Sequence, residues 1–458
     1  MAETMRSLPA WKWTHLAGLL LVFGTARAQK LAVVVVDGLG GGIFHRFSHL
    51  PGFRTFEDEG VWSTKLFPVF PSLPLPNRHS LLTGRLPRRH GIIDDFMYNH
   101  RTGQTFSNFS QDSDFNEVLW WGAEPLYITA AKAKASVAMF FFPECNVNWL
   151  AGPSSCMPPR EDGLSFSDEV YARQVAEATK THDLVMVYHP QIREEISRIG
   201  PNRVAVKNAK EVDRFQQSLE RLVAQARERI DLNVLVISTH GMTGVQRSNI
   251  RVLDDYVPME LLNITIGGGA LKQVIAKNGK THQESLLIQI YSQLRYHNPI
   301  PNVKIYYTAS KIGDMPEWYH YKRSATVADL LLVAQPGYAI VTRDPRKQFP
   351  QEYRVPFGLD GYNNQYPDMM GVFLAYGPGE FYSCAQVFKK AYRKGPVEIC
   401  DVYHLMCKIL RLPCETTPRR IERIDDVLSS DARVAIRSSG SNLHVTKMVI
   451  FLPLVLLV

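Results

Sequence analysis

The sequence contains no low-complexity tract, no internal repeat and no apolar run of the about 20 residues that a membrane-spanning helix needs. These absences exclude a repeat protein, a largely disordered chain and a protein with several membrane spans. The formal net charge of +8 is small for 458 residues, its lysines and arginines are scattered, and no recognition motif accompanies them. We therefore expect no nucleic-acid partner. A hydrophobic content of 45% is that of a packed globular protein with one large domain or two ordinary ones.

The first 28 residues have the features of a secretory signal peptide. Lys12 precedes an apolar run from Leu16 to Phe23, and Ala26-Arg27-Ala28 has the small residues of a cleavage site. We expect cleavage after Ala28, so that the mature chain begins an ectodomain over residues 29–432.

The other end of the chain combines a polar segment with a short apolar tail. Residues 433–447 contain several serines and no long apolar run, which predicts a flexible stalk. The tail, Met448 to Val458, is too short to span a bilayer. With the small residues Ser438 to Ser441 and a short spacer before it, the tail is typical of a glycosylphosphatidylinositol (GPI) anchor signal. The alternative is a short hydrophobic terminus.

Six cysteines agree with a route through the secretory pathway. Cys145 and Cys156 are close enough in the sequence to close one loop. The others lie late in the chain, at Cys384, Cys400, Cys407 and Cys414. Six thiols admit many pairings, so the sequence does not fix the disulfide connectivity. Asn108 and Asn263 begin glycosylation sequons, which predicts a glycoprotein.

Short apolar runs alternate with segments of helical periodicity. The runs are Leu31 to Val36, Ser136 to Phe142, Leu184 to Tyr188 and Val234 to Ile237. Residues 204–230 carry apolar side chains at helical spacing, which predicts a long packing helix between the last two strands. Strand, helix, strand in this order indicates an α/β fold with a largely parallel central sheet and helices on both faces.

Three of these strands deliver polar residues to one edge of the predicted sheet. Asp37 follows the first strand, Tyr188-His189-Pro190 ends another, and Ser238-Thr239-His240-Gly241 follows a third. Ligands of such sheets bind at loops beyond the carboxyl ends of the strands. We therefore expect the site here. The loop Gly38 to Gly42 lacks the spacing of a dinucleotide fingerprint and is interpreted as a loop that approaches this site.

A set of motifs around these positions carries a family resemblance. The motifs are Asp37-Gly38-Leu39, Phe70-Pro71-Ser72-Leu73-Pro74-Leu75-Pro76-Asn77, Leu82-Thr83-Gly84, His90-Gly91-Ile92-Ile93 and Asp368-Met369-Met370-Gly371. From about Lys30 to Leu412 the chain resembles the ectonucleotide pyrophosphatase/phosphodiesterase family of the alkaline phosphatase superfamily. The resemblance implies an alkaline-phosphatase-like fold, hydrolysis of phosphodiesters and two zinc ions. Leu50-Pro51-Gly52-Phe53 and Leu119-Trp120-Trp121 resemble the branch that cleaves choline phosphodiesters.

The family's nucleophile is a Thr or Ser three residues before Asn77, and here that position holds Pro74. Proline has no hydroxyl, so covalent catalysis from this position is excluded. Asn77 stands where the resemblance implies an amide on a phosphate oxygen, and an equal alternative is a role as the cap of the following helix.

The resemblance implies metal ligands of which two are unchanged, Asp37 and His240, and we interpret these as vestigial. Thr239 replaces an Asp, and Asp360 replaces a His. The remaining spaced Asp and His become Arg193 and Ser197. Two protein ligands are too few for a catalytic zinc site, and a guanidinium repels a cation. Asp360 is left to hold a hard cation such as calcium or magnesium, or to pair with Arg193, which we favour.

Three routes to activity remain. Ser72 or Ser80 would have to replace the nucleophile from a displaced position, although both suit caps or helix surfaces. A metal-bound water would need a metal site that the sequence no longer furnishes. A shift of the alignment by two would place Gln191 and Glu195 at the spaced pair, without restoring the nucleophile.

We therefore predict a secreted or cell-surface pseudoenzyme that acts by binding an extracellular protein or a phosphoester, with no cofactor or a weakly held one. Membrane contact would come through the GPI anchor. The alternative is an active metal-dependent ecto-phosphodiesterase with a rewired site, acting on choline-type or nucleotide phosphodiesters.

Overall fold

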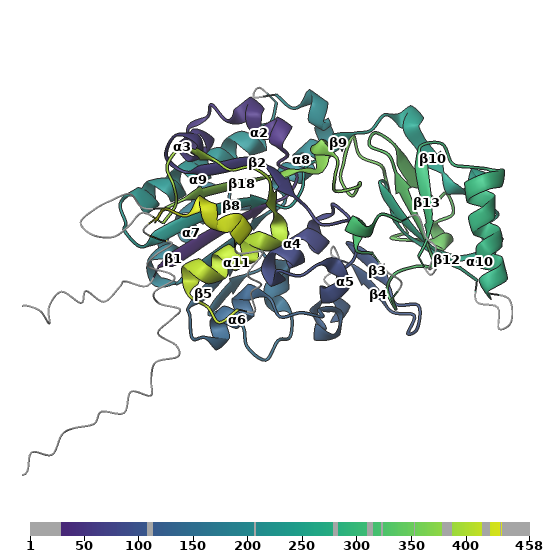
Figure 1. Cartoon of the computed structure of the whole chain (residues 1–458), viewed down its shortest axis with the longest axis horizontal. Coiled ribbons are helices and arrows are strands. Elements are labelled where there is room, and N and C mark those ends of the chain that lie inside the picture. The colour runs from purple at the N-terminus through teal and green to yellow at the C-terminus, as the bar shows by residue number, and fades with distance from the viewer. Residues whose placement is uncertain are drawn as a thin grey trace, which may run out of the picture.

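The computed structural model describes residues 29–107, 113–205, 208–277, 283–308, 315–321, 324–351, 353–377, 387–414, 422–430 and 432. They form an α/β body around a nine-stranded sheet, with a five-stranded sheet beside it (Figure 1). The two sheets matter for function because the candidate site lies between them.

The main sheet is built around β1 (Lys30–Val36), which is paired on both edges and buried along its apolar length. Across the sheet the order is β19 (Tyr392–Arg393), β2 (Val61–Phe67), β18 (Gly371–Tyr376), β8 (Leu232–Ser238), β1, β7 (Leu184–His189), β5 (Val137–Phe140) and β6 (Ser155–Met157), and β20 (Val397–Glu398) also pairs with β2. Only β18 runs antiparallel to its neighbours among these described strands. The predicted largely parallel sheet is therefore confirmed.

Helices cover both faces because successive residues of β1 point to opposite sides. Val33 and Val35 belong to one apolar cluster, whereas Ala32 and Val34 belong to another. The first face is covered by α4 (Pro74–Thr83), α6 (Leu126–Lys132) and α11 (Ile399–Leu410), and the second by α2 (Gly41–Phe47), α3 (Pro51–Glu59), α7 (Glu169–Thr181), α8 (Gln191–Ile199) and α9 (Lys210–Arg227). The helix expected over residues 204–230 is α9.

Between β8 and β18 the chain leaves the main sheet and builds the second one. Its order is β13 (Val303–Tyr307), β14 (Leu330–Ala334), β12 (Leu271–Ala276), β11 (Leu262–Gly268) and β16 (Gln348–Phe349). Helix α10 (Gln283–Ser292) packs Leu287 and Ile290 into the same apolar cluster as Val274 and Leu332. In Figure 1 this unit lies to the right of the main body. The sequence analysis treated the ectodomain as one undivided body and did not identify this sheet.

Short elements join the two units. The two-stranded pairs are β9 (Thr243–Gly244) with β17 (Gly358–Leu359), β10 (Ile250–Val252) with β15 (Ala339–Val341) and β3 (Phe96–Tyr98) with β4 (Thr105–Ser107), and α5 (Pro87–His90) is a single helical turn. Because β9 and β17 follow β8 and precede β18, they hold the start and end of the inserted segment together.

Two disulfides are formed, Cys145–Cys156 and Cys407–Cys414, and the first confirms the loop expected from the sequence. Cys384, Asn108, the predicted signal peptide, and the predicted stalk and tail lie outside the described residues. Within the described ranges, no helix combines the length and apolar character needed to cross a membrane.

Candidate functional site

Asp37 lies fully buried directly after β1, and the two neighbouring strand ends supply its partners. Tyr188 on β7 donates its hydroxyl to Oδ2, and Thr239 directly after β8 donates its hydroxyl to Oδ1. Burial raises the pKa of Tyr188 well above its ordinary value, so the phenol stays protonated and remains a donor. The predicted meeting of three strand ends therefore occurs, but each oxygen of Asp37 already accepts a hydrogen bond from the protein.

The positive charge of Arg78 lies against the ring of Tyr188. The guanidinium of Arg78 lies over the Tyr188 ring at 4.2 Å from its centroid and pairs with Glu144, with both side chains almost fully buried. Burial alone would lower the pKa of Arg78, but Glu144, Tyr188 and Asp37 raise it above its ordinary value. Arg78 thus stays charged and offsets part of the negative charge around Asp37. Sequence analysis missed this pair because its partners are 66 residues apart.

Arg193 and Asp360 form the ion pair that the sequence favoured. Arg193 donates through Nε to Oδ2 and through an Nη to Oδ1 at 3.2 Å. Burial alone would raise the pKa of Asp360, but Arg193 and then His240 bring it below its ordinary value. The charge of Arg193 is favoured by Asp360 first, and then by Asp95 and Asp37. One guanidinium therefore compensates both Asp360 and Asp37, two positions at which the family resemblance implies metal ligands.

His240 lies behind this pair and is fully buried. Its Nδ1 is 2.8 Å from the carbonyl oxygen of Gly241, which can only accept, so Nδ1 carries the hydrogen. Its Nε2 is 3.5 Å from Oδ2 of Asp360. The ring nitrogen that would hold a metal therefore faces an oxygen already bonded to Arg193.

The backbone reaches this ion pair only because of a glycine. Gly38 has φ of +79°, and a Cβ on it would lie 2.8 Å from the Cα of Arg193. Both the left-handed conformation and this contact exclude ordinary side chains. The glycine-rich loop thus approaches the site as expected, and it packs against Arg193.

A cavity of about 360 Å³ opens in front of the ion pair. The main body contributes Leu73, Asp94, Asp95, Phe96, Arg193, Ser197 and Asp360, and the inserted segment contributes Gly267, Gly268, Leu271, Pro350, Tyr353, Arg354, Pro356 and Leu359. We call this cavity the cleft. Arg193 and Ser197 line it, whereas Gln191 and Glu195 do not, so the residues of the alignment shifted by two are not at this cavity. Asp37 and His240 do not line it.

Asp95 is the residue of the cleft that sequence analysis should have singled out. Its Oδ1 accepts the backbone N–H of Leu75 at 2.9 Å, in the first turn of α4. Helix N-termini favour anions, and here the anion is a side chain of the protein itself. Burial raises the pKa of Asp95 to about 6 and that of its neighbour Asp94 to about 7. The available signal was that these two adjacent acids directly follow the motif His90-Gly91-Ile92-Ile93.

Pro74 occupies the first position of α4, where a missing N–H costs nothing. Leu73 is the N-cap residue, so Asn77 lies inside the helix and the capping alternative is wrong. The Asn77 side chain is fully buried: its Oδ1 accepts from Val69 N at 2.6 Å, and its Nδ2 donates to the carbonyls of Pro71 and Leu73 at 3.0 and 2.9 Å. Phosphate binding by Asn77 stays a prediction, and it would require exchange of these bonds.

Neither substitute nucleophile is free to attack. Ser72 donates its hydroxyl to the carbonyl of Tyr362 at 3.0 Å. Ser80 lies 2.9 Å from Nε2 of His90, but Nδ1 of His90 accepts the N–H of Ile92. In neutral His90 the hydrogen is therefore on Nε2, which donates to Ser80 instead of removing its proton. Both serines are fully buried.

The cleft does not fit two zinc ions. Among the residues that the structure describes, no three His, Cys, Asp or Glu side chains gather as a ligand set. Asp37 is held by two hydroxyls and Asp360 by a guanidinium, so a cation at either place would have to displace donors of the protein. A divalent cation would also face the positive charge of Arg193.

Comparisons with known proteins agree with this architecture. The sequence model of the type I phosphodiesterase / nucleotide pyrophosphatase family matches residues 31–363. Ectonucleotide pyrophosphatase/phosphodiesterase family member 7 of Mus musculus is 27% identical over 405 residues, covering 84% of this chain and 84% of that relative. The bis(5'-adenosyl)-triphosphatase ENPP4 of Homo sapiens is 24% identical over 392 residues, covering 84% of this chain and 78% of that relative. The solved structure of human family member 5 superposes with a TM-score of 0.74 at 23% identity, covering 88% of this chain and all of that one. The chain therefore belongs to the type I phosphodiesterase / nucleotide pyrophosphatase family, as an ectonucleotide pyrophosphatase/phosphodiesterase-type member of the alkaline phosphatase superfamily.

Proposed function

We propose that this protein is a secreted or cell-surface pseudoenzyme of the phosphodiesterase family, which acts by binding an extracellular protein or a phosphoester and does not hydrolyse it. The observation that carries the proposal is the position of Arg193. Its guanidinium bonds Asp360 and is favoured by Asp95 and Asp37, so the protein's own cation compensates the carboxylates of the former metal positions.

The missing nucleophile supports the same conclusion. Pro74 offers no hydroxyl, and the hydroxyls of Ser72, Ser80 and Thr239 are buried and bonded. A phosphoryl group placed at the start of α4 would also meet the carboxyl group of Asp95. Hydrolysis by this family requires both a nucleophile and paired cations, and neither is supported here.

An active phosphodiesterase with a rewired site is the second candidate. It is favoured by the relatives, one of which is named as a bis(5'-adenosyl)-triphosphatase. The substrates would be nucleotide or choline-type phosphodiesters. This candidate requires that a cation displace Arg193 from Asp360, and that water replace the missing alcohol as the nucleophile.

Exposure to the outside of the cell is supported by two disulfides, since such bonds persist in oxidising compartments. The relatives are named as ecto-enzymes. Attachment by a GPI anchor can be tested on transfected cells, where a phosphatidylinositol-specific phospholipase C should release the protein. Retention on the cell after this treatment would dismiss the anchor.

The choice between the two candidates rests on activity and metal content of the full chain, expressed through the secretory pathway of animal cells. We expect no hydrolysis of bis-p-nitrophenyl phosphate with added zinc, calcium or magnesium beyond that of the Asp37→Ala variant. The matched control is Asp58→Ala, an exposed aspartate on α3. Turnover that Asp37→Ala abolishes and Asp58→Ala preserves would establish the active enzyme, as would two tightly held zinc ions per chain.

A further inference from the structure

A second cavity lies on the other side of the segment that lines the cleft. It has a volume of about 510 Å³, within the range of small-molecule sites. Gly91 and Ile93 face this cavity, whereas the next residues, Asp94 and Asp95, face the cleft. We call it the arginine pocket, because Arg88 and Arg89 on α5 line one end of it.

The charge of the arginine pocket has one sign. None of its lining residues is acidic, and both arginines are exposed. Among the residues that the structure describes, neither Arg88 nor Arg89 forms an ion pair. Two guanidiniums without a carboxylate present fork-shaped donors suited to an oxyanion such as phosphate, sulfate or carboxylate.

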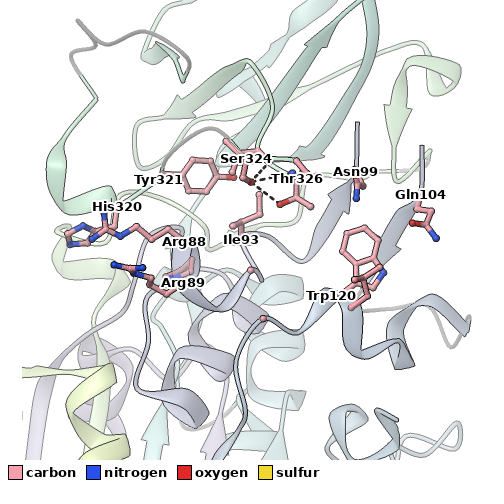
Figure 2. Close-up of a pocket in the computed structure, with 16 residues that line it drawn as sticks. Arg88, Arg89, Ile93, Asn99, Gln104, Trp120, His320, Tyr321, Ser324 and Thr326 are labelled. Carbon is pink, nitrogen blue, oxygen red and sulfur yellow. Dashed lines mark hydrogen bonds between the residues drawn. The ribbon is translucent and has the colours of Figure 1, made fainter. Parts of the chain in front are cut away.

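The other walls of the arginine pocket suit an apolar body. Figure 2 shows Arg88, Arg89 and His320 at one end, with Trp120, Asn99 and Gln104 at the opposite end. Ile93, Trp120 and Val327 contribute apolar surface to the same cavity. An occupant could thus place its charged group at the arginines and its apolar part toward Trp120.

One polar group of this pocket is left as an open donor. Asn99 uses Oδ1 to accept the N–H groups of Arg101 and Thr102, which leaves its amide nitrogen as a donor. Asn99 is only partly buried, so a ligand with acceptor atoms can accept a hydrogen bond from this nitrogen.

We propose that the arginine pocket is a binding site for small organic anions, in which Arg88 and Arg89 hold an oxyanion head and Trp120 and Ile93 contact its apolar body. The site shares no lining residue with the cleft, so it does not depend on whether the protein hydrolyses phosphodiesters.

The test is isothermal titration of the full chain with 1-naphthyl phosphate, 1-naphthyl sulfate, neutral 1-naphthol and inorganic phosphate. Both naphthyl anions should bind at least tenfold more tightly than naphthol or phosphate alone. The double variant Arg88→Ala with Arg89→Ala should lose at least tenfold in affinity, and the Lys variants of both should lose less. Leu119→Asp, which places a carboxylate at an 83% exposed position of the lining, should weaken binding as well.

Two controls decide where the anion binds. Arg173→Ala with Arg221→Ala removes two arginines on α7 and α9, away from the pocket, and should leave the affinity unchanged. Arg354→Ala removes an arginine of the cleft and should also leave it unchanged. The proposal is overturned if Arg354→Ala abolishes binding while the Arg88 and Arg89 variants retain it. It is also overturned if naphthol binds as tightly as the naphthyl anions.

Discussion

Replacing Arg193 by methionine tests whether this side chain neutralises the cleft. Methionine keeps much of the apolar stem but leaves Asp360, which is 1% exposed, without its cation. Breaking a buried ion pair from one side costs about 3–5 kcal/mol. Because 22% of the Arg193 side chain is exposed, we expect the lower end, a loss of about 3 kcal/mol in the free energy of unfolding at pH 7.5.

The pH dependence of this loss follows from Asp360. In the wild type its pKa is lowered, so its contribution to stability is present above the ordinary pKa of an aspartate and is lost as the pH falls through the folded value. Without Arg193, burial raises the pKa of Asp360 and favours the neutral acid. The deficit of Arg193→Met should therefore shrink between pH 7.5 and pH 5. Asp360→Asn combined with Arg193→Met should cost less than Arg193→Met alone, because no buried charge remains unpaired.

The assay is guanidinium unfolding followed by tryptophan fluorescence and by circular dichroism at both pH values. The matched control is Arg54→Met, which breaks an ion pair whose side chains are 64% and 58% exposed, with an expected cost below about 0.5 kcal/mol. If Arg193→Met costs no more than this control, or if its deficit does not change with pH, Arg193 does not neutralise Asp360.

Three further outcomes are expected. Asn77→Ala should lower the free energy of unfolding by about 2–4 kcal/mol, measured by the same unfolding assay, because it leaves buried backbone groups without partners. The pKa values of Asp94 and Asp95, about 7 and 6, lie above their ordinary values, so the folded state binds extra protons and stability should fall as the pH rises from about 4 to 7. Asp94→Asn should flatten this decline in thermal unfolding midpoints. Replacing Cys145 and Cys156 by serine, a pair 11 residues apart, should cost about 2–3 kcal/mol in the unfolding assay, and no loss would refute a structural role for this bond.

The central sheet could be predicted because its buried strands are continuous apolar runs. The run from Leu31 to Val36 became β1, and those near residues 184 and 234 became its two neighbours. The inserted sheet was missed although its strand β14 is also a continuous buried apolar run. Two of the other strands carry no clear pattern, because β11 is partly exposed and β16 has only two residues.

The candidate site was predictable where the motif spacing fixes the residue. The motif comparison placed Arg193 and Asp360 at positions of implied metal ligands and favoured their ion pair, which the structure contains. The sequence could not show that Tyr188 would bond Asp37, because a hydroxyl at a strand end has many potential partners. For Asn77 the position in the motif was known, but the motif does not tell which loop carbonyls the side-chain amide binds.

Asp95 accepts the backbone N–H of Leu75 in the first turn of α4. This hydrogen bond has a consequence for any attempt to build catalysis into the site. Exchanging Pro74 and the other substituted positions for the residues that the family resemblance implies would still leave the carboxylate of Asp95 bonded to the start of α4. An incoming phosphodiester would have to displace this carboxylate, or bind when the carboxyl group is protonated. We therefore expect that Pro74→Thr alone would not produce hydrolysis, because the carboxylate of Asp95 would still lie at the start of α4.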